Sequence, residues 1–415
     1  MTDIQKENKS GGKVPNLRFP EFEGEWEVKK LGEVMDFKVT NSFSRENLNY
    51  EYGTVKNIHY GDIHTKFQTL FDINYESVPF INEEIDISRI SEENYCKNGD
   101  VIFADASEDL NDVGKSIEII NINEERLLSG LHTLLARPKK DIFHLGFSGY
   151  LFKSNSVRTQ IQKESQGSKV LSISVGRISK IELSFPSVEE QKKISSFLAL
   201  LDERIQTQSK IINDLKTLKI ATAKKIFSGE LRFKDDNGND FPEWEVREVG
   251  EVFKITRGNV LAMNLVSNQC NEKNTYPVYS SQTKNNGLAG YYTDFLFEDA
   301  ITWTTDGANA GDVNYRSGKF YCTNVCGVLI SNEGYANSCI AELINSVSKN
   351  YVSYVGNPKL MNGVMSEIKI PFPSFPEQTK IANFLSAIDS KIDMENQLLQ
   401  KLEEQKKYLL QNMFV

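Results

Sequence analysis

The chain has 415 residues, is 39% hydrophobic and carries a formal net charge of −9. This length favours two or three domains that each bury a core. No apolar run approaches the roughly 18 residues that a membrane span needs, and the polar segment 1–13 lacks the apolar stretch of a secretory signal. We therefore expect a cytoplasmic protein without membrane contact, with a disordered tail at 1–13.

A first globular region is expected at 14–187. Gly, Asn, Ser and aromatic residues alternate there with short apolar runs such as 99–103, which favours strands joined by loops. The net charge hides a local pattern, because 126–180 holds ten Lys or Arg residues and only Asp141 and Glu164 against them. Local basic surface suits nucleic-acid phosphates, although a solvated face explains it equally well.

The segment 109–116 of this region nearly spells a phosphate-binding loop. Its first position is Asp109, where that motif requires glycine so that backbone N–H groups can approach a phosphate, and the run that follows is typical of a strand. We therefore reject a nucleotide-binding loop. Ser107, just before the segment, and Lys115, within it, are candidates for DNA contact, since hydroxyl and ammonium groups suit phosphates.

Residues 188–227 are predicted to form one long helix. Ser187 can cap its start, with Glu190 three residues later completing a capping box, and Gly229 is a natural stop. Apolar residues recur within it at the three-four spacing of a coiled-coil seam.

A second globular region is expected at 228–374. Cys322 and Cys326 are spaced like half of a zinc site, but no second Cys or His pair lies near them, so two strand cysteines are the better interpretation. Two loops, 279–287 and 304–311, carry amide, hydroxyl and basic side chains that suit bases and phosphates, although ordinary turns explain them as well. The candidate DNA contacts here are Ser281, Gln282, Lys284, Asn286, Thr305, Asn309, Tyr315 and Arg316.

A second long helix is predicted at 375–415. Each seam position of the first helix is apolar again 187 positions later, and the polar seam positions Gln208 and Lys219 return as Glu395 and Lys406. Two helices that share a seam register are expected to pack on one another. The seam residues nearest the helix starts are Ile194, Leu198, Leu201 and Ile205 in the first helix and Ile381, Leu385, Ile388 and Ile392 in the second.

No catalytic motif is visible. The sequence lacks the Asn/Asp-Pro-Pro-aromatic loop of an amino-methyltransferase and any G-x-G-x-x-G turn. Glu27-Val28-Lys29 offers the E-x-K of a metal nuclease, but its repeat is Glu245-Val246-Arg247, and Arg cannot shed a proton as a catalytic Lys might. We therefore expect a binding role, with no catalytic residue, metal site or cofactor in this chain.

Two phrases of the sequence occur twice. Glu190-Gln191 and the residues after it return at Glu377-Gln378, and the Trp-Glu-Val phrase at Trp26 returns 218 positions later at Trp244. Both globular regions also end in an alternating strand followed by Pro-Ser. A duplication that keeps these phrases and changes the segments between them predicts a pseudo-twofold architecture.

These paired phrases resemble the specificity subunits of type I restriction-modification enzymes. The resemblance rests on the Pro-x-x-x-Glu-Gln-x-x-Ile helix starts at 186–194 and 373–381 and on the openings at Trp26 and Trp244, and it covers nearly the whole chain beyond the tail. It implies an α+β fold with two β-rich target-recognition domains, at 14–187 and 228–374. Two long antiparallel coiled-coil helices, 188–227 and 375–415, separate these domains.

The resemblance also implies a function. Each domain is expected to bind one half of a split, asymmetric site in double-stranded DNA, while the helices set the spacing and dock methylation subunits. Restriction subunits join that complex, and S-adenosylmethionine, ATP and Mg²⁺ are expected only in these partner subunits. The alternatives are a stand-alone DNA nuclease or methyltransferase, and a coiled-coil scaffold that touches only protein.

Overall fold

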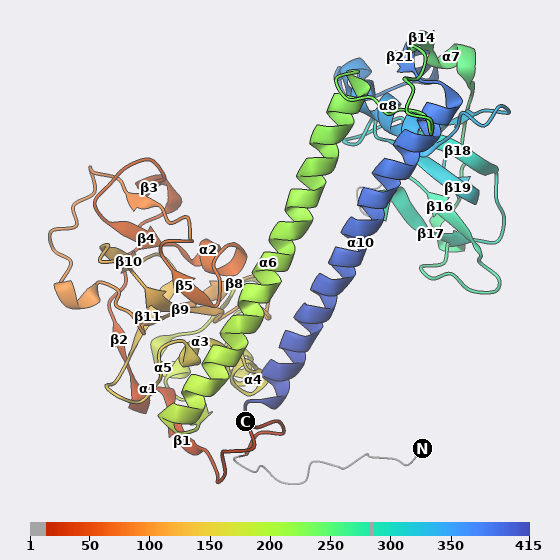
Figure 1. Cartoon of the computed structure of the whole chain (residues 1–415). Coiled ribbons are helices and arrows are strands. Elements are labelled where there is room, and N and C mark those ends of the chain that lie inside the picture. The colour runs from red at the N-terminus through yellow and green to blue at the C-terminus, as the bar shows by residue number, and fades with distance from the viewer. Residues whose placement is uncertain (1–13, 282–284) are drawn as a thin grey trace, which may run out of the picture. The chain divides into compact units, whose positions relative to one another are not determined.

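The computed structural model describes residues 14–281 and 285–415, and the chain divides into two compact units (Figure 1). Unit 1 contains the chain up to Ser209 and from Leu398 onward, and unit 2 contains Lys210–Gln397. Each unit therefore combines one globular region with part of each long helix. Among the described residues, no helix is both long and apolar enough to cross a membrane.

The long helices begin where the sequence predicts. Helix α6, green in Figure 1, spans Val188–Phe227, and α10, blue, spans Phe375–Asn412. Gly229 follows α6 at a φ of 77°, a left-handed conformation that glycine adopts without steric cost. Helix α10 ends before the predicted residue 415, because Met413 and Phe414 leave it to pack in the hydrophobic core of unit 1.

Two ion pairs define the direction of the helices. In unit 1, Lys406 of α10 pairs with Asp202 of α6, and in unit 2, Lys219 of α6 lies 2.8 Å from Asp389 of α10. Residue numbers rise along α6 from Asp202 to Lys219, while those of their partners on α10 fall from 406 to 389. The helices therefore run antiparallel. The polar seam positions at Lys219 and Lys406 thus hold two copies of one interhelical bridge.

Six of the eight predicted seam residues are buried, and their packing partners differ between the two units. Ile194 and Leu198 pack in the core of unit 1 with Trp26 and Phe147, so the start of α6 is also part of the globular core. In unit 2, Ile381 and Leu385 pack with residues of α6 and of the globular region. The others that are buried are Leu201 and Ile392, whereas Ile205 and Ile388 are half-buried.

The globular part of unit 1 is built from short strands. Their bounds are β1 Glu27–Lys30, β2 Met35–Lys38, β3 Leu48–Asn49, β4 Lys56–Ile58, β5 Leu70–Asp72, β6 Phe80–Ile81, β7 Val101–Ala104, β8 Ala106–Ser107, β9 Ser116–Asn121, β10 Leu127–Ser129, β11 Thr133–Pro138, β12 Leu171–Ser172 and β13 Glu182–Phe185. A five-stranded sheet has the order β2-β11-β7-β9-β5, in which only β9 and β5 pair in parallel. A four-stranded sheet, β10-β4-β6-β3, and two strand pairs, β1 with β13 and β8 with β12, complete the region.

Five short helices lie between these strands. They are α1 Leu31–Val34, α2 Tyr60–Thr65, α3 Phe147–Leu151, α4 Asn155–Glu164 and α5 Val175–Ile178. Every residue of α3 is buried, and Val157 and Ile161 are the buried face of α4. Both helices contribute to the core that also holds the start of α6.

The globular part of unit 2 repeats the five-stranded sheet. Its strands are β14 Glu245–Glu248, β15 Lys254–Arg257, β16 Tyr276–Tyr279, β17 Leu288–Tyr292, β18 Phe297–Thr304, β19 Val313–Cys322, β20 Cys326–Ile330 and β21 Lys369–Phe372. In the sheet β15-β20-β18-β19-β16-β17, the first five strands have the order and the directions of their unit 1 counterparts, again with one parallel pair, β19 with β16. Cys322 and Cys326 are strand residues, as predicted.

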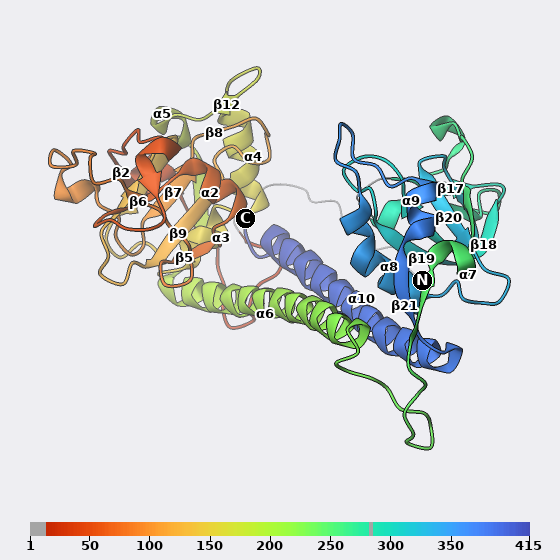
Figure 2. The same ribbon diagram turned by 90° about the horizontal axis from the view of Figure 1, so that it is seen from above.

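Three helices accompany this sheet, α7 Val249–Val252, α8 Ser338–Ser348 and α9 Asn362–Glu367. Helix α8 lies beside the sheet (Figure 2). Its Ile340 and Ile344 pack in one core with Trp303 and Val313 of the sheet. The side chain of Asn345 accepts a hydrogen bond from the backbone N–H of Val313 at 3.0 Å, which fixes α8 against β19.

Candidate nucleic-acid interface

A buried Arg–Glu pair, here called the latch, closes each globular region. In unit 1, Arg18 donates to both carboxylate oxygens of Glu190, at 2.8 and 2.7 Å; in unit 2, Arg232 does the same to Glu377, at 3.0 and 2.9 Å. The two glutamate side chains are 2% and 0% exposed. Bidentate pairs of this kind are among the strong charge-assisted hydrogen bonds, and they raise the pKa of both arginines.

The latch corrects the predicted capping box. Ser187 caps α6, since its Oγ accepts the Glu190 N–H at 3.4 Å, but the Glu190 carboxylate binds Arg18 instead of returning to the cap. The glutamine beside it also has a local task, because Gln191 Nε2 donates to the carbonyl oxygen of Pro186 at 2.9 Å. Sequence reasoning missed the arginines, although Leu-Arg-Phe occurs at both 17–19 and 231–233.

The opening and closing phrases of each region are paired strands. Strand β1 pairs antiparallel with β13 and aligns Glu27 with Phe185, and β14 pairs with β21 and aligns Glu245 with Phe372. Glu27 and Glu245 therefore lie in the strand pairs that close the two regions. The latch and the strand pair together bring both ends of a globular region to the start of a long helix.

Four backbone hydrogen bonds, here called the shared frame, occur in both regions at the end of the central strand. In unit 1 they are Ala104 N to Lys115 O, Gly114 N to Ala104 O, Asp105 N to His132 O and Ile173 N to Asp105 O, at 2.8, 2.8, 3.0 and 2.9 Å. In unit 2 they are Thr304 N to Asp312 O, Gly311 N to Thr304 O, Thr305 N to Val325 O and Leu360 N to Thr305 O, at 3.0, 2.9, 3.0 and 2.9 Å. The backbone is therefore equivalent at these positions.

The side chains on the shared frame differ in chemistry. Asp105 and His132 of unit 1 correspond to Thr305 and Val325 of unit 2, and the cationic Lys115 corresponds to the anionic Asp312. Both glycines of the frame keep a left-handed φ, 65° for Gly114 and 87° for Gly311. The frame preserves its backbone geometry while its side chains change; Thr305 is buried, and the other substituted side chains are at least partly exposed.

Three of the four histidines of the chain gather around Tyr60 in unit 1. The ring of Tyr60 lies 4.6 Å from that of His59, 5.9 Å from that of His64 and 5.3 Å from that of His132, measured between centroids. His64 donates from Nε2 to the Ala106 carbonyl at 3.1 Å.

Burial, aided by Arg45, lowers the pKa of His59 to about 4, so its Nδ1 is free to accept the Gly61 N–H. We call this group the histidine cluster.

Two cationic side chains pair with a buried carboxylate of α2, the helix that carries Tyr60 and His64. Arg45 and Lys66 lie 2.7 and 3.0 Å from the carboxylate of Asp62, whose side chain is 0% exposed. Burial alone would raise the pKa of Asp62, but hydrogen bonds from Arg45 and Lys66 outweigh burial and lower it. Of the sequence-predicted contacts, Lys115 donates to the His64 carbonyl at 2.7 Å, and Ser107 Oγ accepts the Asp109 N–H at 3.0 Å.

In unit 2, the predicted contact Arg316 lies inside the protein. Its guanidinium is stacked 3.8 Å from the ring centroid of Tyr279 and donates to Thr302 Oγ1 at 3.0 Å and to the Asn286 carbonyl at 2.7 Å. Burial lowers its pKa. Arg316 and Asn286 line a polar cavity of about 160 Å³, so Arg316 supports the exposed Asn286 loop rather than projecting from it.

The other predicted contacts of unit 2 fall into three groups. Asn309 and Ser281 come together, since Asn309 Nδ2 donates to the Ser281 carbonyl at 3.2 Å. Thr305 is fully buried, and Tyr315 donates to Asp299 at 3.2 Å. Gln282 and Lys284 lie outside the described residues.

Sequence reasoning missed a group of three charged side chains beside the shared frame of unit 2. Asp306 follows Thr305 and lies 3.7 Å from Arg257 and 4.0 Å from Lys359. All three side chains are partly exposed, between 31% and 52%. Asp306 and Lys359 form a backbone β-bridge, as Ala106 and Ser172 do in unit 1, so they occupy the equivalent positions.

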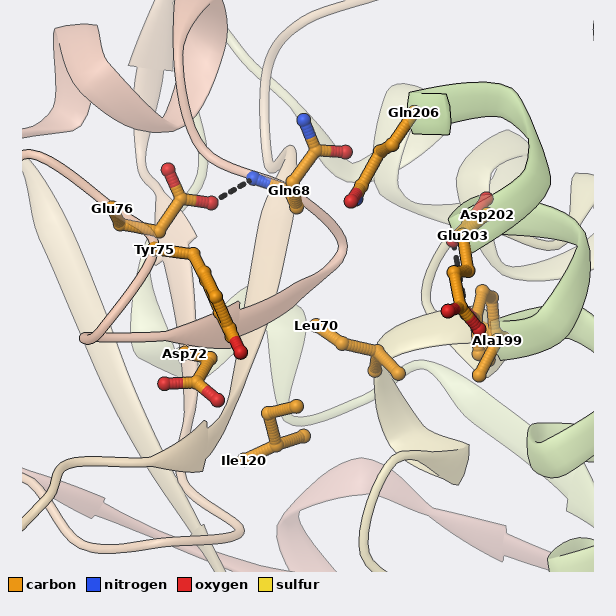
Figure 3. A pocket seen from close by; sticks show the side chains of 11 residues that line it. Gln68, Leu70, Asp72, Tyr75, Glu76, Ile120, Ala199, Asp202, Glu203 and Gln206 are labelled. Carbon is orange, nitrogen blue, oxygen red and sulfur yellow. Dashed lines mark hydrogen bonds between the residues drawn. The ribbon is translucent and has the colours of Figure 1, made fainter. Parts of the chain in front are cut away.

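A cavity of about 410 Å³ in unit 1 is lined by acidic side chains (Figure 3). Asp72, Glu76, Asp202 and Glu203 line it, and Glu76 accepts the Gln68 N–H at 2.8 Å. Burial raises the pKa of Glu76. Lys406 pairs with Asp202, but the lining itself is acidic and repels phosphate, so this cavity does not suit the DNA backbone. Within the described ranges, no group of three or more His, Cys, Asp or Glu side chains is placed to hold a metal ion.

Comparison with known proteins gives consistent matches. The model of the type I restriction modification DNA specificity domain matches residues 23–217 and again residues 242–404. A putative type I specificity subunit of Mycoplasma pneumoniae is 31% identical over 240 residues, which are 56% of this chain and 92% of that protein. A putative type I restriction enzyme specificity subunit of Methanocaldococcus jannaschii is 25% identical over 416 residues, 94% of this chain and 93% of that protein.

The fold has counterparts among solved structures. The S subunit of a type I restriction-modification system from M. genitalium has a TM-score of 0.59 at 17% identity, covering 97% of this chain and 99% of that chain. A chain from a structural study of complex assembly and conformational transition in the type I R-M system has a TM-score of 0.57 at 14% identity, covering 93% and 96%. Because the two family matches include most of the chain, this protein belongs to the family of type I restriction-modification DNA specificity subunits.

Proposed function

We propose that this chain reads a split, asymmetric DNA site for a type I restriction-modification complex, with each globular region binding one half. The observation that carries this proposal is the shared frame: one backbone arrangement, present twice, bears the accessible side chains of Asp105, His132 and Lys115 in unit 1 but those of Val325 and Asp312 in unit 2. Base edges in the major groove are distinguished by hydrogen-bond donors and acceptors, so unlike side chains favour unlike half-sites.

The long helices are the proposed spacer between the half-sites. Helix α6 has 40 residues and is about 60 Å long at 1.5 Å per residue, compared with about 34 Å for one turn of duplex DNA. In unit 1, Tyr150 of α3 donates to Asp202 of the interhelical bridge at 2.9 Å. In unit 2, Lys219 of the other bridge donates to Glu342 of α8 at 2.8 Å. Each bridge therefore fastens its own globular region to the helix pair.

The same helices are the proposed docking surface for methylation subunits. Apolar side chains remain exposed on them, with Leu200 65% and Tyr408 58% exposed in unit 1, and Ile220 71% and Met394 62% exposed in unit 2. Several exposed apolar side chains on one pair of helices would be buried by a protein partner that docks there. Replacing Ile220 and Met394 with Glu is expected to weaken assembly with methylation subunits without altering which DNA sequence is read.

The proposed chain is a non-catalytic adaptor. Methylation subunits would bring S-adenosylmethionine, and restriction subunits would bring ATP and Mg²⁺, so no cofactor is assigned here. The purified chain incubated with DNA, Mg²⁺ and S-adenosylmethionine is expected to leave the DNA uncut and unmethylated. Cutting or methyl transfer by the chain alone would favour the nuclease or methyltransferase alternative.

Mapping methylated adenines tests the central proposal. The genome of a strain that expresses this chain with its methylation subunits is compared with that of a strain lacking only this chain. The expected result is one additional motif made of two different short blocks separated by unspecified bases. An unchanged set of methylated sites, or a single contiguous motif, would overturn the proposal.

A further inference from the structure

We propose that His132 is a specificity-determining residue for the half-site bound by unit 1 and that Asp105 positions it. This inference rests on the proposed function and assigns the residue that contacts one base pair. His132 lies at the tip between β10 and β11, with 50% of its side chain exposed. Neither histidines nor this tip was among the contacts that the sequence suggested.

The geometry holds the ring of His132 in one orientation. Its Nδ1 lies 3.2 Å from Asp105 Oδ1, and its ring packs edge-on against Tyr60 at 5.3 Å. Its backbone carbonyl accepts the Asp105 N–H at 3.0 Å in the shared frame. His132 also has a φ of 54°, a left-handed conformation that is uncommon for residues other than glycine. A side chain fixed this firmly before binding loses little freedom when it contacts a base.

The contact to Asp105 determines which ring nitrogen is available. A carboxylate accepts, so Nδ1 donates to Asp105 and Nε2 is the ring nitrogen left for a ligand, on a side chain that is half exposed. A neutral ring then offers Nε2 as an acceptor for the amino group of adenine or cytosine, and a protonated ring offers a donor to purine N7. Both are contacts to a base edge in the major groove, and base analogues distinguish them.

The comparison with unit 2 supports a role for His132 in distinguishing bases rather than in binding DNA of any sequence. Val325 occupies the equivalent position on the shared frame and has no side-chain hydrogen-bond donor or acceptor. The two earlier candidates in unit 1 are engaged within the region, Ser107 with the Asp109 N–H and Lys115 with the His64 carbonyl. Lys115 can still add a phosphate contact, which carries no sequence information.

The test replaces His132 in the full chain, assembled with its methylation subunits. His132→Asn is the main variant because Asn tolerates the left-handed backbone, and His132→Ala removes the whole ring. Methylated adenines are mapped for each variant, and the preference for each base at each position of both half-sites is measured. We expect roughly a ten-fold loss of discrimination at one base pair of one half-site and no change in the other.

Variants of Asp105 test whether this residue positions the ring of His132. Val325→Ala tests whether the effect is confined to the half-site bound by unit 1. Asp105→Asn keeps an oxygen that can accept the Nδ1 proton and is expected to retain part of the discrimination, whereas Asp105→Ala loses it at the same base pair. Val325→Ala is expected to leave the unit 1 half-site unchanged. A merely structural role for Asp105 predicts an equal loss at every position.

Base analogues in the mapped half-site complete the test. If Nε2 accepts, removing the exocyclic amino group is expected to weaken binding by the unaltered complex; if Nε2 donates, the 7-deaza purine is expected to do so. Neither analogue is expected to weaken binding further in His132→Ala. Unchanged base preference in both His132 variants would overturn the inference while leaving the split motif intact. If no split motif is found at all, the proposed function fails instead.

Discussion

The two globular regions have the same scaffold but differ in how each is fastened to the helices. Both have the five-stranded sheet, the latch and the shared frame. In unit 1 a neutral phenol, Tyr150, contacts the interhelical bridge, whereas in unit 2 a carboxylate, Glu342, does so. The conserved parts set backbone geometry, and the variable parts lie where a region meets a ligand or a helix.

Removing the latch arginine is expected to have the largest effect. Arg18→Ala or Arg232→Ala leaves a buried carboxylate unpaired, which costs about 3–5 kcal/mol of the free energy of unfolding. The larger loss is expected for Arg18→Ala, because Glu377 keeps a 2.8 Å hydrogen bond from Trp244 Nε1, whereas Trp26 Nε1 has no partner among the described residues. Urea unfolding measures both losses.

The exposed pair of Arg247 and Glu245 is the matched control for the latch. Its side chains are 40% and 68% exposed, so Arg247→Ala is expected to cost less than about 1 kcal/mol. Equal losses for Arg247→Ala and Arg232→Ala would show that the latch adds no stability through burial.

Among the described residues, unit 1 has a buried carboxyl, Glu118, whose pKa lies near neutrality. Glu118 of β9 accepts the N–H groups of Gly146 and Gly149 at 2.7 and 2.6 Å, yet burial raises its pKa to about 7. The folded state therefore holds a proton that the unfolded state releases near pH 4.5, and this contribution to stability is lost as pH rises toward and through 7. The total from this group is about 3 kcal/mol.

Glu118→Gln tests this pH dependence by urea unfolding from pH 4 to pH 8. The variant is expected to lose the decline in stability over that range that the unaltered chain shows. The equivalent position in unit 2 is Tyr315, which pairs with Ile301 as Glu118 pairs with Val101, and Tyr315→Phe is the control expected to leave the slope unchanged. An unaltered slope in Glu118→Gln would contradict the assignment.

The frame glycines are expected to differ in their tolerance of a methyl group. A Cβ at Gly114 would lie 2.5 Å from Ile161 Cγ2, and one at Gly311 would lie 2.9 Å from Val352 Cγ2. Left-handed strain and overpacking together predict a loss of about 2 kcal/mol for Gly114→Ala and less for Gly311→Ala, measured by thermal unfolding. Gly176→Ala, in open space with an ordinary φ, is expected to change little. The reverse order would show that Val352 adapts less easily than Ile161.

The two interhelical bridges give the smallest expected difference. Asp202 and Lys406 are 15% and 21% exposed, whereas Asp389 in the equivalent pair is 50% exposed. A double-mutant cycle with Asp202→Asn and Lys406→Met is expected to give a coupling energy of about 1 kcal/mol. The cycle with Asp389→Asn and Lys219→Met should give less, because solvent screens the more exposed pair. Equal couplings would mean that exposure does not govern these bridges.

Local sequence pattern predicted the helical part of the molecule well. The spacing of Ile194, Leu198 and their repeats located both long helices, because seam periodicity and stop signals act within a few turns. The latch was missed because Arg18 and Glu190 lie 172 positions apart, and no local rule connects them. Gly229 could be predicted from its neighbours; Arg18 required the fold.

The candidate interface was harder to predict for the same physical reason. Ser107, Lys115, Asn286 and Asn309 were chosen by side-chain chemistry, and that choice cannot distinguish a residue that projects from one that is engaged internally, such as Arg316. His132 and Asp105 come together only because β7 and β11 are neighbours in the sheet. The common sheet was also hidden, since the two regions preserve strand order without preserving sequence.

The interhelical bridges have an evolutionary consequence. Asp202 and Lys219 on one helix correspond to Asp389 and Lys406 on the other, so each helix carries both the acid and the base of the pair, in the same order. Such a surface is self-complementary when two copies run antiparallel. A gene encoding one region and one helix could therefore be doubled in tandem, and the fused product would need no new contact to join its halves.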